Sequence, residues 1–188
     1  MVNELVKKCR SYRRFNEKRR MSDKMLLSFI QNASLTPSGS NLQPLKYKIV
    51  NDIDENGKLF KSLKWAGYLK DWKGPKEGER PASYIIILGD TSISKIFSVD
   101  LGISAYTLML SAAERGIGSC MIGSIERDDV RRQFEIPEKF DILLVVAFGF
   151  PDEEVVLEKA KGDNIRYYRD MEQVHHVPKR DLDDLIIT

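Results

Sequence analysis

Three short segments of the sequence carry side chains that could hold a phosphorylated ligand. Residues 10–15 read Arg-Ser-Tyr-Arg-Arg-Phe, and residues 177–180 read Val-Pro-Lys-Arg near the other end of the chain. Guanidinium and ammonium groups bind phosphate through charge-assisted hydrogen bonds, so these cationic segments suit a phosphate held from two sides. Residues 37–44, Pro-Ser-Gly-Ser-Asn-Leu-Gln-Pro, add hydrogen-bonding groups and a glycine that allows close backbone approach. We expect a ligand site here; for the loop alone, an ordinary polar connection is the alternative.

The glycines at positions 116, 118 and 123 invite a different interpretation, a dinucleotide-binding fingerprint. The sixth position of that fingerprint is Met121 instead of glycine. The segment also follows a predicted helix and leads into a strand, the reverse of the order that places a pyrophosphate at a helix N-terminus. We therefore reject a Rossmann site.

Metal and thiol chemistry are not expected either. His175 and His176 are adjacent, so on an extended segment they point to opposite sides and make a poor metal pair. The sequence has no P-loop, HExxH or paired-cysteine motif, and neither Cys9 nor Cys120 resembles a nucleophile. Two cysteines without a secretion signal favour a reducing compartment, so we expect a cytoplasmic protein.

Taken together, the motifs resemble those of the FMN-dependent nitroreductase family. The shared features are the Arg-Ser-x-Arg segment at 10–13, the Pro-Ser-x-x-Asn-x-Gln-Pro loop at 37–44, and the basic residues near the C-terminus. The resemblance continues through residues 116–123 and 136–151 and spans nearly the whole chain apart from residues 52–80. It implies an α+β fold with a mixed central β-sheet flanked by helices, in an intertwined homodimer whose C-terminal segment crosses to the partner.

The resemblance also implies how the basic residues would bind FMN. Arg10 and Ser11 would contact phosphate or ribityl oxygens, and Lys179 and Arg180 would approach the phosphate from the far end of the chain. Arg13 matches a basic position beside the flavin N1 and O2 atoms, where a positive charge stabilises the anionic reduced flavin. The alternative for each arginine is a surface ion pair.

The remaining expected contacts concern the flavin ring. Those implied by the family are Pro37, Ser38, Gly39, Asn41 and Gln43 from the loop, commonly across the dimer interface, and Ile122, Gly123 and Ser124 near N5 and O4. Two departures weaken the match. Cys9 replaces a frequent arginine, and Leu45 stands where relatives often carry tryptophan.

Composition predicts a single soluble globular domain over residues 1–188. Hydrophobic content of 42% and charged content of 31% are ordinary, and the longest apolar run is too short for a membrane span. A net charge of +2 is too balanced for general affinity to nucleic acid or membranes, although six basic residues gather between positions 10 and 20.

Periodicity and capping residues predict the secondary structure. Ser22 is expected to cap a helix that ends before Pro37, and Asp54 to cap a short helix; further helices are expected over 98–115, ended by Gly116, and near 128–134. Strands are expected at 47–50, 84–88, 118–122 and 143–148, with an aromatic-rich irregular segment at 65–82. We expect the apolar residues within 181–188 to be buried, either against the same chain or against a second copy of it.

These observations favour an enzyme in which FMN accepts hydride from NADH or NADPH and then reduces a small electron-poor acceptor, nitroaromatic or quinone, by ping-pong turnover. The rival hypothesis is a flavin-binding or storage protein with little turnover. The sequence leaves the nicotinamide preference and the physiological acceptor open.

Overall fold

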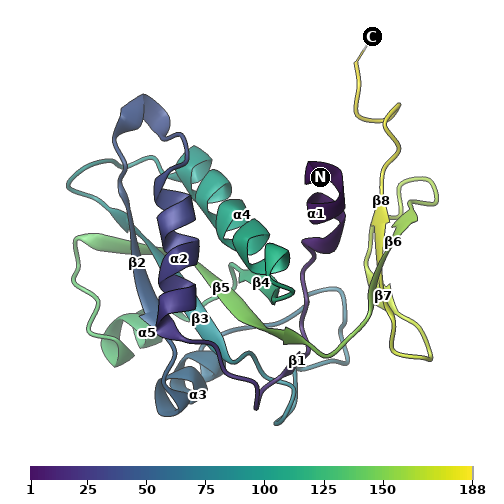
Figure 1. Cartoon of the computed structure of the whole chain (residues 1–188), viewed down its shortest axis with the longest axis horizontal. Coiled ribbons are helices and arrows are strands. Elements are labelled where there is room, and N and C mark those ends of the chain that lie inside the picture. The colour runs from purple at the N-terminus through teal and green to yellow at the C-terminus, as the bar shows by residue number, and fades with distance from the viewer. Residues whose placement is uncertain (188) are drawn as a thin grey trace.

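The computed structural model describes residues 1–187 and has a five-stranded antiparallel sheet at its centre (Figure 1). Strand β5 (Phe140–Pro151) pairs with β3 (Ser83–Asp90), β4 (Gly118–Ile122) and β1 (Phe15–Asn16), and β2 (Leu45–Val50) pairs with the other edge of β3. A parallel bridge joins Ser11 to Ser119. The α+β fold with a helix-flanked central sheet is therefore confirmed, although the five strands pair antiparallel where a mixed sheet was expected.

Helices cover both faces of this sheet because β3 is apolar on both sides. Every residue of β3 is buried. Ile85 and Ile87 pack with α2 (Asp23–Ser34) and α4 (Ser98–Glu114), which Figure 1 shows in front of the sheet. Tyr84 and Ile86 face the opposite side, in a core that includes residues of α3 (Ile53–Lys61) and α5 (Arg127–Gln133).

The helix ends show which capping predictions were right. The Ser22 side chain accepts a hydrogen bond from the Met25 N–H, so the predicted cap of α2 is confirmed. The predicted cap of α3 by Asp54 was wrong, because Asp52 accepts the first-turn N–H groups and Asp54 lies inside the helix. Gly116, just after α4, has a φ of +69°, which ends a helix without the strain that a side chain would add.

A second, three-stranded sheet follows β5 and has no counterpart among the sequence predictions. Strand β8 (His175–Lys179) lies between β6 (Val155–Lys159), with which it is parallel, and the short antiparallel β7 (Tyr168–Arg169). Figure 1 draws α1 (Val2–Lys8) between α4 and this small sheet.

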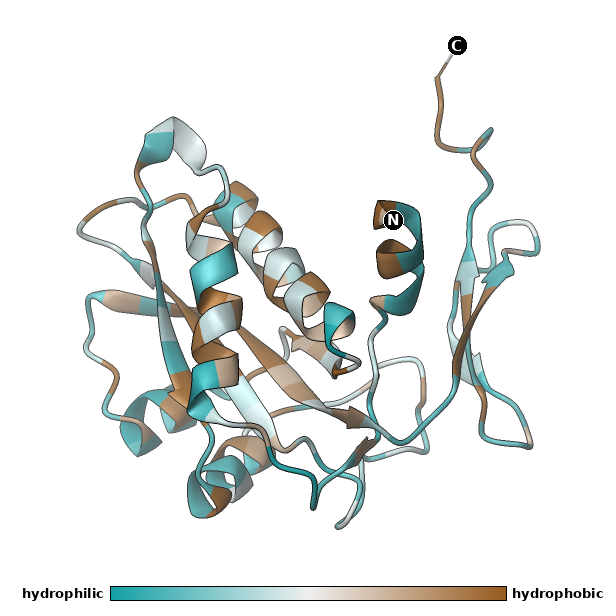
Figure 2. Cartoon of the chain, viewed as in Figure 1, coloured by the Kyte–Doolittle hydropathy of each residue, from teal (hydrophilic) through white to brown (hydrophobic). Residues whose placement is uncertain are grey.

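The two chain ends expose apolar side chains. Val2 on α1 is 79% exposed, and Leu182 and Leu185 beyond β8 are 69% and 64% exposed. Figure 2 shows hydrophobic residues along both of these segments. The expectation that residues 181–188 are buried is thus not met within the described chain, and Thr188 lies outside it. No helix among residues 1–187 has the length and apolar character needed to span a bilayer.

Candidate functional site

The loop that connects α2 to β2 is held in a strained, polar conformation. Ser40, Asn41 and Gln43 have φ values of +49°, +56° and +50°, in the left-handed region that residues with side chains rarely adopt. The Ser38 hydroxyl accepts a hydrogen bond from the Gln43 N–H at 2.9 Å, and the Gln43 amide donates to the Asn41 side-chain oxygen at 3.1 Å. Backbone strain persists only where the surrounding structure maintains it, and it is concentrated at ligand and active sites.

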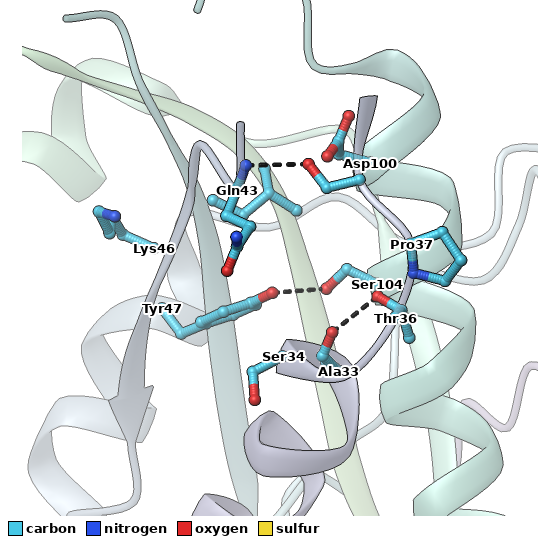
Figure 3. Close-up of a pocket in the computed structure, with 11 residues that line it drawn as sticks. Ala33, Ser34, Thr36, Pro37, Gln43, Lys46, Tyr47, Asp100 and Ser104 are labelled. Atoms are coloured by element: carbon cyan, nitrogen blue, oxygen red, sulfur yellow. Dashed lines mark hydrogen bonds between the residues drawn. The ribbon is translucent and has the colours of Figure 1, made fainter. Parts of the chain in front are cut away.

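A pocket of ≈ 210 Å³ lies beneath this loop (Figure 3). Pro37, Ser38 and Gln43 form part of its wall, with Tyr47 of β2 and Ser104 of α4 joined by a 2.9 Å hydrogen bond between their hydroxyls. Ligand sites for drug-sized molecules usually measure about 300–1,000 Å³. The pocket in one chain is therefore too small for a flavin and offers only part of a site.

The loop is also tied to the first turn of α4. The Gly39 N–H donates to the Asp100 carboxylate at 3.4 Å, and a Cβ at Gly39 would lie 3.4 Å from the same oxygen. A Cβ at that distance would make only an ordinary contact, so the hydrogen bond to Asp100, and not a lack of space, ties the loop to α4. Asn41 is exposed and is not among the residues that line the pocket.

The N-terminal cationic segment, residues 10–15, lies beside β4, although the two are far apart in the sequence. The Tyr12 N–H donates to the Ser119 carbonyl at 2.9 Å, next to the parallel bridge between Ser11 and Ser119. Strand β4 then leads to Ile122, which is buried, and to Gly123, which is exposed. The fold thus brings the Arg-Ser-x-Arg segment alongside the strand that carries the predicted residues 122–124.

Residues 122–124 leave space on one side of the backbone. A Cβ built at Gly123 would meet its nearest neighbour, a Leu144 methyl, only at 3.9 Å. The Ser124 carbonyl accepts from the Lys64 N–H at 3.0 Å, and the Gly123 carbonyl accepts from Arg127 at 3.4 Å. These bonds fix the turn while the glycine keeps its outer face open.

Arg10 presents a donor that the described chain does not use. One terminal nitrogen of its guanidinium donates to the Val6 carbonyl at 2.6 Å, near the end of α1. Its Nε is buried and has no partner within residues 1–187. A buried guanidinium donor without an acceptor is expensive, so an anionic ligand is the natural partner.

Arg13 is anchored to the small sheet, a feature that the sequence analysis missed. Its guanidinium donates to the Ser11 carbonyl at 3.2 Å, lies 2.9 Å from Nε2 of His175, and stands 4.5 Å above the Tyr167 ring. Burial, with help from the Arg13 charge, lowers the pKa of His175 to about 4. His175 is therefore neutral at physiological pH, and its Nε2 accepts from Arg13.

A buried ion pair also holds the segment of Arg13 and Arg14 in place. Glu153 pairs with Arg169 at 2.7 Å, with side-chain exposures of only 1% and 7%. The Glu153 carboxylate also accepts the backbone N–H groups of Arg13 and Arg14. Arg169 in turn lies 4.3 Å from the Trp72 ring, so the 65–82 segment packs against the small sheet.

Lys179 and Arg180 are not brought to Arg13 within one chain. Lys179 is the last residue of β8 and Arg180 follows it, so they stand four and five residues after His175, roughly 13 Å or more along an extended chain. The Arg180 guanidinium pairs instead with exposed Asp163 at 2.9 Å. Their predicted phosphate contact therefore stays a prediction.

His176 and Cys9, two further titratable groups, are accounted for by their surroundings. His176 lies between Glu158 and Asp170, at 3.2 and 3.0 Å, and the hydrogen bond to Asp170 raises its pKa. Burial raises the pKa of Cys9 to about 11, which fits the expectation that it is no nucleophile. No cluster of potential metal ligands occurs in the part of the chain that the structure describes.

Comparison with known proteins establishes the family. The model of the nitroreductase family matches residues 6–150, and the chain therefore belongs to the nitroreductase family. The matched stretch includes the Arg-Ser-x-Arg segment, the strained loop and residues 122–124, and it ends before Lys179.

Individual relatives agree with this assignment. An Archaeoglobus fulgidus protein named "Putative NADH dehydrogenase/NAD(P)H nitroreductase" is 26% identical over 77% of this chain and 82% of its own. The iodotyrosine deiodinase of Thermotoga neapolitana is 22% identical over 81% of this chain and 90% of its own. Among solved structures, a nitroreductase family protein from Streptococcus pneumoniae TIGR4 superposes with a TM-score of 0.70 at 21% identity and covers 100% of both chains. This last similarity shows the shared fold.

Proposed function

We propose that this protein is an FMN-dependent oxidoreductase that takes hydride from NADH or NADPH and passes the electrons to a small electron-poor acceptor by ping-pong turnover. The family match over residues 6–150 carries the proposal, because it spans most of the residues expected to hold the flavin. A solved relative from Clostridium difficile R20291, named an FMN-dependent nitroreductase, has a TM-score of 0.67 at 23% identity over 87% of this chain and 92% of its own.

The donor set suits the flavin phosphate. Arg10 supplies a buried Nε without a partner in the described chain, and Ser11 lies next to it on a segment fixed against β4. We propose that these two residues bind the phosphate or ribityl oxygens and that Lys179 and Arg180 add charge. When bound, FMN supplies hydride acceptance and transfer.

Arg13 would contribute a fixed positive charge near the pyrimidine edge of the ring. Its position is set by neutral His175 and by the Tyr167 ring, so little reorganisation is needed to present the charge. The open face at Gly123 would let the ring approach the backbone of residues 122–124 closely.

We propose that a second copy of the chain completes the site. The strained loop encloses only ≈ 210 Å³, and Arg10 and Arg13 do not line this pocket. The exposed apolar side chains of α1 and of residues 182–187 provide surface for such a homodimer. The two free, buried cysteines suit a reducing compartment, and we propose the cytoplasm.

The rival hypothesis is a flavin-storage protein with little turnover. Anaerobic stopped-flow mixing of the purified holoprotein with NADH and with NADPH distinguishes it from the proposed enzyme. Bleaching of the flavin bands within seconds, followed by reoxidation on adding a quinone or nitroaromatic acceptor, is expected of the enzyme. Because one relative is an iodotyrosine deiodinase, 3-iodotyrosine belongs in the acceptor panel. Flavin that stays oxidised with both nicotinamides would contradict the proposal and favour storage.

A further inference from the structure

A second, larger pocket opens on the face of the sheet opposite α2 and α4. It measures ≈ 580 Å³, within the range of about 300–1,000 Å³ usual for small-molecule sites. Its walls come from α3, from the chain after β1 and from the segment before β3. None of the residues expected to hold the flavin lines it.

Three polar atoms of residues that line this pocket have no hydrogen-bond partner among residues 1–187. Tyr84 is 0% exposed, and its hydroxyl makes no hydrogen bond to any described residue. Asn56, 7% exposed, donates from Nδ2 to the Ala82 carbonyl at 2.7 Å, while its Oδ1 is buried and has no partner in the described part of the chain. The Nε of Arg80 is also buried, and no residue that the structure describes accepts a hydrogen bond from it. Such atoms normally have partners, so their presence at one pocket points to a ligand.

The unpartnered atoms determine what kind of ligand would fit. The Arg80 Nε and the Tyr84 hydroxyl can donate, whereas the Asn56 Oδ1 can only accept. A simple anion would leave Asn56 unpaired, and a cation would leave Arg80 unpaired. An amide or lactam edge, with a carbonyl beside an N–H, can pair with both kinds of atom.

The other side chains around this pocket suit a ligand with a flat ring. The Arg80 guanidinium lies 4.7 Å from the Phe60 ring, so the two planar groups form one side of the pocket together with Pro81. Charges around the pocket are mixed, because Glu17 and Glu77 line it along with the basic residues. A ring without a strong net charge is therefore favoured.

We propose that this pocket binds a small flat ring with a lactam edge, of the pyrimidine-base type, at a site separate from the proposed flavin site. Uracil is the probe, titrated calorimetrically into the protein as purified, and 1,3-dimethyluracil is the matched control ligand because it has the same ring and carbonyls but no N–H. Saturable binding of uracil at one site per chain is expected, with the dimethyl compound binding at least several-fold more weakly.

Tyr84→Phe tests the hydroxyl directly. Removing an unpartnered hydroxyl should leave the melting temperature of the ligand-free protein equal or higher, while uracil affinity falls about 2- to 12-fold, the change expected for one hydrogen bond. Tyr168→Phe is the control, since its hydroxyl bonds to Glu158 on the small sheet, and uracil affinity should be unchanged. Phe60→Leu, which replaces the ring face, should also weaken uracil binding.

Several results would overturn the proposal. Absence of saturable uracil binding means that water, and no lactam ring, pairs with these atoms. Equal affinity for uracil and 1,3-dimethyluracil would show that no ligand N–H donates to the Asn56 Oδ1. A Tyr84→Phe protein that melts several degrees lower shows that the hydroxyl has a partner within the protein, and one that binds uracil normally shows that the hydroxyl takes no part.

Discussion

Replacing Arg13 with alanine should slow flavin reduction and also loosen the N-terminal segment. The guanidinium donates to the Ser11 carbonyl and to His175 Nε2 at 2.9 Å, and it stacks over Tyr167 at 4.5 Å. Arg13→Ala removes all three contacts and the positive charge proposed to face the flavin. The two consequences have different magnitudes and different assays.

The stability loss follows from the contacts. A hydrogen bond from a charged group contributes about 1.5–3 kcal/mol, and a partly exposed cation–π contact about 0.5–1 kcal/mol. Arg13 is half-buried and both hydrogen bonds come from one nitrogen, so solvent screening keeps the total below the sum of these contributions, and we expect a loss of about 2 kcal/mol. In a chain of this size that lowers the melting temperature by roughly 4–8 °C, measurable by circular dichroism.

The effect on reduction should be larger. Removing one preorganised group that stabilises developing negative charge costs about 2.7–4 kcal/mol, or roughly 100- to 1,000-fold in rate. Anaerobic stopped-flow reduction by NAD(P)H measures this directly, and a redox titration should show a lower midpoint potential. Arg13→Lys keeps the charge but loses the planar stack, so it should recover most of the rate and little of the stability.

Arg14→Ala is the matched control for this experiment. Arg14 donates to Gln173 at 3.0 Å and pairs with Glu79 at 3.6 Å, so its loss should also destabilise the segment. It should leave the reduction rate and the potential unchanged. Wild-type reduction by Arg13→Ala, or equal slowing by Arg14→Ala, would refute the role assigned to the Arg13 charge.

Four further outcomes are expected. Glu153→Gln leaves Arg169 charged and buried without its partner, so urea denaturation should show a loss of about 3–5 kcal/mol; an unchanged midpoint would contradict the ion pair. The two carboxylates beside His176 raise its pKa in the folded state, so protonated His176 stabilises the fold below about pH 6.5, and this contribution is lost as the pH rises through the raised pKa. The melting temperature of the wild type should therefore fall over that pH range, and His176→Ala should not show the fall. Deletion of residues 176–188 should give flavin-free protein that is monomeric or aggregated on a sizing column, and a flavin-loaded dimer would refute both roles of the tail. Asn41→Gly, which tolerates the φ of +56°, should keep flavin affinity and lower turnover several-fold, whereas normal turnover would make the loop a plain connection.

The core elements could be predicted from sequence because their signals are local. The helix expected over 98–115 is α4, Ser98–Glu114, and the strand expected at 84–88 is β3, Ser83–Asp90. Long apolar runs and regular periodicity specify such buried elements without knowledge of the rest of the chain. The cap of α3 was misplaced by two residues because Asp52 and Asp54 are both good caps, and only the backbone geometry distinguishes them.

The small sheet and its link to Arg13 could not be predicted in this way. Strands β6 and β8 alternate poorly and are partly exposed, so they carry no clear period. The sheet is held instead by contacts between distant residues, such as Glu153 with the backbone of Arg13. His175 and Arg13 are 162 residues apart, and their pairing leaves no local pattern in the sequence.

The visible absorption spectrum of the protein as purified tests the central claim most directly. The proposed function predicts flavin absorption bands in near-stoichiometric amount with the protein, released as FMN on denaturation. A colourless protein that also takes up no FMN when the cofactor is added would contradict the account.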